Sequence, residues 1–149
     1  MKKKYITIEK INKVEEPMVA YEVNINSNPL SIIESARKGI SFSKALELAD
    51  KMSLSQLEFA NILHISLRTL QRYEVSKILD ADESSKIIQL QSINNRGVQV
   101  FGDQKSFNQW LRTTIISLSN KTPIQYFDTP FGFQLISQIL GRIEHGIFA

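Results

Sequence analysis

Hydrogen-bonding side chains suited to reading DNA bases gather in one short stretch, LRTLQR at residues 67–72. In the major groove, Arg reads guanine and Gln reads adenine through paired hydrogen bonds. Ser66 stands directly before the stretch and is a good helix cap, so these side chains fall on the first turns of a helix. The residues predicted to contact DNA are therefore Ser66, Leu67, Arg68, Thr69, Gln71 and Arg72.

The residues before this helix complete a helix-turn-helix pattern over 54–73. Ala60 is small enough to let two helices cross closely, and Leu63 and Leu70 supply apolar contacts behind the crossing. His64 stands where the turn needs a left-handed backbone, which His adopts more readily than most residues other than glycine. We interpret it as a turn residue and not as a ligand or base. Two packed helices without a nucleic-acid role are the alternative.

Catalytic and metal chemistry is poorly supported. The chain has no cysteine and only two histidines, which excludes a disulfide or thiolate site and argues against a zinc site. No nucleophile, paired carboxylate or Gly-rich phosphate loop accompanies His64 or His145. Asp103 and Asp128 are better explained as a helix cap and a helix-flanking residue. We therefore predict a protein that is not an enzyme and uses no cofactor or metal.

Length and charge narrow the possible architectures. The chain has 149 residues, of which 42% are apolar, so it fits one domain or two small helical subdomains sharing a core. The net charge of +3 is spread thinly, so a monomer should bind DNA weakly and a homodimer would double the phosphate contacts. The opening MKKK precedes no continuous apolar run, and no stretch approaches the ~20 apolar residues of a membrane span. A cytoplasmic protein without membrane contact is expected.

Start and stop signals predict where the first helices lie. Residues 1–30 alternate β-branched and charged residues around Pro17, which favours an N-terminal arm with short strands. Asn28-Pro29 reads as a break, and Ser31 is expected to cap a short helix. Further serines offer caps for the following helices: Ser41 or Ser43, then Ser53 and Ser55.

The second half carries equally clear signals. Asp80 and Glu83 form a capping box for a long helix, which Gly97 is expected to interrupt. Asp103 caps the next helix, in which Phe107, Trp110 and Leu111 recur at helical spacing and indicate core. Thr122-Pro123 and Thr129-Pro130 each pair a capping hydroxyl with proline at the first helical position. The last helix carries an apolar stripe and stops at Gly146.

These segments, in this order, resemble the Xre/MbcA/ParS-type antitoxins. The likeness covers residues 31–149 and includes RTLQRY in the helix-turn-helix, then VFGD, WL, TPIQYFDTPFG and the terminal LGRIEHGIFA. Residues 112–121 depart from it, because they read RTTIISLSNK where the family has a proline and asparagine followed by an Ala-Leu-Gly-Gly run.

The resemblance implies an all-α fold, a small helical bundle with an Xre-like helix-turn-helix. The predicted parts are the arm at 1–30, a DNA-binding domain at 31–97 and a toxin-binding domain at 98–149. The partner implied is a RES-domain toxin, of a family that looks like ADP-ribosyltransferases and uses NAD. In the family the C-terminal tail approaches the toxin's active-site cleft. The matching residues are Arg142, Glu144, His145, Gly146, Ile147, Phe148 and Ala149.

The leading hypothesis is an antitoxin of a type II toxin-antitoxin system. It would occlude the toxin's active site and repress its own promoter as a homodimer on a palindromic operator. A stand-alone helix-turn-helix regulator whose C-terminal domain only dimerises is the alternative. From the residues alone, a tail that is frayed or folded back on its own core is favoured, and it is the resemblance that favours entry into the toxin's cleft.

Overall fold

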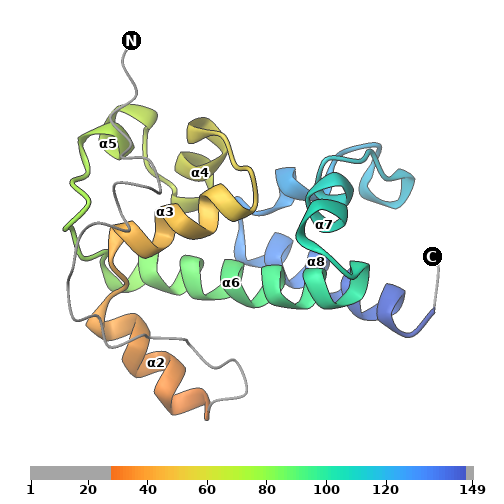
Figure 1. Cartoon of the computed structure of the whole chain (residues 1–149), viewed down its shortest axis with the longest axis horizontal. Coiled ribbons are helices and arrows are strands. Elements are labelled where there is room, and N and C mark those ends of the chain that lie inside the picture. The colour runs from red at the N-terminus through yellow and green to blue at the C-terminus, as the bar shows by residue number, and fades with distance from the viewer. Residues whose placement is uncertain (1–27, 147–149) are drawn as a thin grey trace.

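The computed structural model describes residues 28–146, which form helices joined by turns and loops, with no sheet within this range (Figure 1). The helices in chain order are α2 (Pro29–Lys38), α3 (Phe42–Lys51), α4 (Gln56–Leu63), α5 (Leu67–Arg72), α6 (Ala81–Phe101), α7 (Gln104–Leu111) and α8 (Pro130–Glu144), with 3-10 turns η1 (Ile116–Leu118) and η2 (Pro123–Tyr126) before α8. The predicted all-α class is confirmed. The strands predicted for the N-terminal arm lie outside the described residues.

The long helix α6 is the element around which the others are arranged. Helix α2 packs against its N-terminal half, and α7 and α8 pack against its C-terminal half. The pair α4 and α5 lies above the N-terminal part of α6 in Figure 1. The predicted domain boundary at residue 97 falls inside this helix, so both halves of the described chain share α6.

Gly97 does not interrupt α6, and that prediction was wrong. The helix runs unbroken from Ala81 to Phe101. A Cβ atom on Gly97 would overlap the ring of Phe107, because this ring packs directly against the backbone of α6. Phe107 is fully buried and stacks on Phe101 and Trp110, with ring centroids 6.1 and 6.0 Å away. Glycine is therefore needed here for close approach of α7, and the predicted core role of Phe107 is confirmed.

Polar caps begin most helices at the predicted residues. The side chains of Ser41, Asp80, Asp103 and Thr129 each accept a hydrogen bond from a backbone N–H in the first turn of the helix that follows. These bonds satisfy donors that have no partner within the helix itself. Local sequence therefore set where these helices start.

The start of α2 was predicted wrongly. Asn28 caps it, accepting a hydrogen bond from the backbone N–H of Leu30 at 3.1 Å, and Pro29 takes the first helical position. Ser31 donates its hydroxyl to the Asn28 carbonyl instead of capping. Asn28-Pro29 is thus a helix start and not a break, since proline's fixed backbone angle suits the first turn. No helix in the described range is both long and apolar enough to span a membrane.

Replacing Gly97 with alanine should lower the free energy of unfolding by about 1–3 kcal/mol, because the methyl group overlaps the Phe107 ring. Alanine favours a helix by about 1 kcal/mol over glycine, so helix propensity alone predicts the opposite sign. Urea titration measures the change. Gln99→Ala, at an exposed site on the same helix, should change stability by less than about 0.5 kcal/mol. A stabilised Gly97→Ala variant would contradict the packing argument.

Candidate functional site

Helices α4 and α5 form the predicted helix-turn-helix. Ser55 and Glu58 cap α4 reciprocally, at 3.1 Å from the Glu58 N–H to the serine hydroxyl and 2.8 Å from the Ser55 N–H to the carboxylate. His64 ends α4 in the left-handed conformation with φ of 58°, as predicted. Ser66 then caps α5 through the Thr69 N–H at 3.0 Å. Ala60 is buried, as expected for a small residue in a helix-turn-helix, and α4 and α5 pack against each other.

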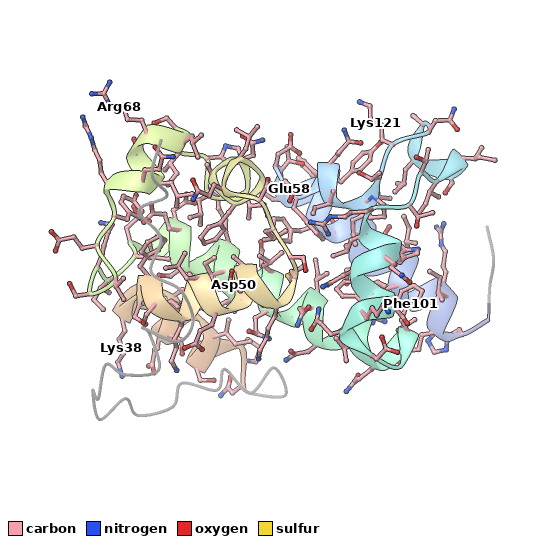
Figure 2. All side chains as sticks on the ribbon, turned by 45° about the horizontal axis from the view of Figure 1, so that its top comes forward. Lys38, Asp50, Glu58, Arg68, Phe101 and Lys121 are labelled. Atoms are coloured by element: carbon pink, nitrogen blue, oxygen red, sulfur yellow. The ribbon has the colours of Figure 1, made fainter. Side chains whose placement is uncertain are left out.

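The six side chains predicted to read DNA do not have equal freedom. Arg68 and Arg72 are exposed, and within residues 28–146 neither guanidinium takes part in a hydrogen bond or ion pair. Figure 2 shows Arg68 pointing away from the body of the molecule. Leu67 is at the surface beside them. The two guanidinium groups are therefore available to a partner without loss of a hydrogen bond or ion pair within residues 28–146.

The remaining three candidates are engaged within the fold. The hydroxyls of Ser66 and Thr69 bond to each other at 2.8 Å. Gln71 is partly buried and donates to the side-chain oxygen of Gln56 at 3.1 Å. The amide nitrogen of Gln56 is itself buried, with no partner among the described residues. Base reading by Gln71 would therefore have to share or replace its bond to α4.

Contacts from α7 tie the C-terminal half to the helix-turn-helix. The Arg112 guanidinium donates to the carbonyls of Met52 and Ser53 at 3.4 and 2.6 Å and to the Glu58 carboxylate at 3.1 Å. Asn108 donates to the Lys51 carbonyl at 2.8 Å. The positive charge of Arg112 therefore balances the negative charge of Glu58. Glu58 consequently does not reduce the positive charge that Arg68 and Arg72 give to α5. Sequence reasoning missed this clamp because its partners lie more than fifty residues apart.

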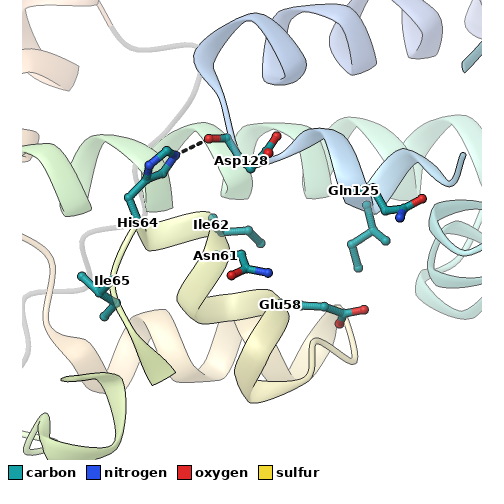
Figure 3. A pocket seen from close by; sticks show the side chains of 8 residues that line it. Glu58, Asn61, Ile62, His64, Ile65, Gln125 and Asp128 are labelled. Carbon is teal, nitrogen blue, oxygen red and sulfur yellow. Dashed lines mark hydrogen bonds between the residues drawn. The ribbon is translucent and has the colours of Figure 1, made fainter. Parts of the chain in front are cut away.

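His64 makes a second link between the halves. Its imidazole Nε2 bonds to the main-chain carbonyl of Asp128, which lies between η2 and α8 (Figure 3). A pocket of about 650 Å³ opens beside this bond between α4 and η2, with Asn61, Ile124 and Gln125 among its lining residues. His64 is thus a turn residue, as predicted, and it also contacts the C-terminal half. The contact between His64 and Asp128 could not be predicted from local sequence, because the two residues are 64 positions apart.

A half-buried phenol joins the end of α5 to the start of α6. Tyr73 donates its hydroxyl to the carboxylate of Glu83, which is buried and caps α6. Burial raises the pKa of Tyr73, and the hydrogen bond to Glu83 raises it further. The ring also packs edge-on against Phe42 at a centroid distance of 5.4 Å. The phenol is a neutral structural donor, and no cluster of acidic or imidazole groups in residues 28–146 could hold a metal ion.

The residues predicted to bind a toxin fall into three groups. Arg142, His145 and Gly146 are exposed at the end of α8. Glu144 is not free, because Arg96 on α6 donates to its carboxylate at 3.1 Å. The last three, Ile147, Phe148 and Ala149, lie outside the described residues.

Arg96 also fixes the preceding turn of α8. It donates to the carbonyl and hydroxyl of Ser137 at 3.4 and 3.3 Å. Its guanidinium lies close over Gly141, where a Cβ atom would come within 2.9 Å of a guanidinium nitrogen. The small residue at 141 therefore leaves room for the Arg96 guanidinium. Together these contacts link the last turns of α8 to α6.

Comparison with known proteins assigns both halves. Residues 31–92 match the Antitoxin Xre-like helix-turn-helix domain, and residues 96–146 match the Antitoxin Xre/MbcA/ParS C-terminal toxin-binding domain. The chain belongs to the Xre-type antitoxins. An antitoxin of a toxin-antitoxin system with a helix-turn-helix domain is a regulatory protein and not an enzyme. Its toxin-binding domain implies a cognate toxin, and the helix-turn-helix implies DNA binding.

Curated relatives agree with this assignment. The antitoxin is 28% identical over 121 residues to Antitoxin Xre of Photorhabdus laumondii subsp. laumondii, covering 80% of this chain and 74% of the relative. It is 24% identical over 120 residues to Antitoxin Xre of Yersinia enterocolitica, covering 79% and 81%. A protein of Sphingobium sp. named Prs ADP-ribosylating antitoxin is 22% identical over 143 residues, covering 89% and 90%.

Replacing Arg112 with alanine in the antitoxin should lower the free energy of unfolding by about 1–2 kcal/mol, because hydrogen bonds to two carbonyls and a carboxylate are lost together. Chemical denaturation measures it. Arg142→Ala removes an exposed arginine from α8 and should change stability by less than about 0.5 kcal/mol. Equal stability of the two variants would mean that the Arg112 clamp does not stabilise the fold.

Proposed function

We propose that this antitoxin neutralises a RES-type, NAD-consuming toxin and represses its own operon, as part of a type II system in the cytoplasm. The observation that carries the proposal is the match of residues 96–146 to a toxin-binding domain whose last helix ends exposed. The family resemblance supplies the RES class. The Sphingobium relative, named an ADP-ribosylating antitoxin, is consistent with chemistry on NAD.

Neutralisation would work by steric occlusion. The contacts of Arg96 to Glu144 and Ser137 link the last turns of α8 to α6. Two apolar side chains, Ile147 and Phe148, follow Gly146 in the sequence. An apolar segment of this kind fits a concave site, where buried aromatic anchors supply much of the binding energy. Residues 98–149 are proposed as the toxin-binding domain on this basis.

Repression would use α5. Arg68 and Arg72 are exposed and without partners in the described part of the chain, as base-reading or phosphate-binding side chains should be. A six-residue helix reads only a few base pairs, so a homodimer on two half-sites would supply useful affinity. Residues 31–97 are proposed as the DNA-binding domain.

The partner is tested directly by co-expressing the antitoxin with the product of the adjacent gene. We expect the two proteins to co-purify, and we expect NAD loss caused by the purified toxin to stop when antitoxin is added. A toxin that binds but leaves NAD intact would refute the RES assignment alone. Absence of any complex would favour a stand-alone regulator whose C-terminal half only dimerises.

Deleting Ile147, Phe148 and Ala149 should weaken neutralisation, because the segment proposed to enter the cleft is lost. Cell growth on toxin induction and NAD content measure this effect. Operator affinity, measured by gel shift, should stay unchanged because α5 lies in the other half. Full protection of cells by the truncated antitoxin would rule out occlusion by the tail.

Changing Arg68 or Arg72 to alanine should each cost about 1–3 kcal/mol of binding to the antitoxin's own promoter fragment if these side chains contact bases. Arg37→Ala is the matched control, since it removes an exposed arginine from the last turn of α2 and should leave affinity unchanged. Fluorescence anisotropy with a scrambled competitor separates specific from nonspecific binding. If both variants bind like the unmodified protein, α5 is not the recognition surface.

A further inference from the structure

Two apolar side chains stand out of the C-terminal half. Ile116 is 86% exposed and Phe131 is 82% exposed, the highest values among large apolar side chains in residues 28–146. Both lie within the segment that matches the toxin-binding domain. Scattered exposed apolar residues are common on protein surfaces, so exposure alone does not indicate a partner. Their local settings distinguish these two.

Neither side chain buries much of its surface within residues 28–146. Phe131 is the second residue of α8, in a first turn where an acidic side chain would favour the helix and where none is present. The Phe131 ring stays in solvent and packs little against the rest of the described fold. Ile116 opens the 3-10 turn η1, and the residue of η1 that packs inward is Leu118. Polar residues at both sites would suit the isolated antitoxin better.

The elements that carry these side chains, η1 and the first turn of α8, are both in contact with Tyr126. The Tyr126 hydroxyl donates to the Leu118 carbonyl at 2.7 Å, which fixes η1. The main-chain carbonyl of Tyr126 lies against Gly132, where a Cβ atom would overlap the carbonyl oxygen. That close approach fixes the first turn of α8 next to Phe131. Because η1 and the first turn of α8 are already ordered, less conformational entropy is lost when a partner binds to them.

We propose that Ile116 and Phe131 are apolar anchors that bind the toxin, which presents an apolar pocket to each. The inference rests on the proposed toxin partner but not on its RES class or on the tail. A standard interface covers about 800 Å² on each partner. Because η1 and the first turn of α8 both contact Tyr126, they lie close enough for one partner with an interface of that size to contact both. Exposed apolar anchors in such interfaces supply a large share of affinity.

The test uses the full-length antitoxin and the toxin encoded by the adjacent gene, purified from the co-expressed complex and then separated. Affinity is measured by biolayer interferometry for Ile116→Ser and Phe131→Ser. Leu30→Ser and Leu57→Ser are matched controls, because these leucines are 66% and 57% exposed in the other half of the chain. Circular dichroism monitors folding, and Phe131→Leu keeps an apolar group at the anchor.

We expect each anchor variant to weaken toxin binding about tenfold or more, with both controls within about twofold and Phe131→Leu retaining most of the affinity. Folded anchor variants that bind toxin like the unmodified antitoxin would overturn the inference while leaving the proposed function intact. Loss of self-association with unchanged toxin affinity would also overturn it, because the anchors would then join two antitoxin copies. If the unmodified antitoxin does not bind this toxin at all, the proposed function fails first.

Discussion

The close packing of Phe107 against the backbone of α6 at Gly97 is the constraint on which the architecture depends. A ring buried against a helix backbone requires that the helix carry no side chain there, and it fixes the distance between α6 and α7. From that contact α7 is placed so that Arg112 and Asn108 reach the carbonyls at the end of α3. The position of the helix-turn-helix therefore depends on packing in the other half of the chain.

Much of the fold is local in origin and was predictable for that reason. Ser66, Asp80 and Thr129 cap helices through atoms within three residues of themselves, and short spacing carries that information. The left-handed turn at His64 followed from the same kind of reasoning. Gly97 was misread because a glycine within a helix signals either a break or a close approach, and only the partner ring distinguishes them.

The candidate sites show the same limit. Exposure of Arg68 and Arg72 follows from their places on α5. In contrast, the engagement of Gln71 by Gln56, of Glu144 by Arg96 and of His64 by Asp128 involves partners from 15 to 64 residues away. Residue type and spacing identify side chains capable of binding, whereas only the folded chain shows which of them are already bonded to another residue. Within residues 28–146, this distinguishes Arg68 and Arg72, whose side chains have no hydrogen-bond or ion-pair partner, from Gln71, Glu144 and His64, which have one.

The shared helix also bears on how the antitoxin is degraded. Because α6 supplies packing surface to α2 on one side and to α7 and α8 on the other, neither half retains a complete apolar core if the other is lost. Proteolysis within α6 would thus expose core residues of both halves together, and no stable fragment carrying a single half should accumulate. Cellular turnover of this protein would then be an all-or-none event.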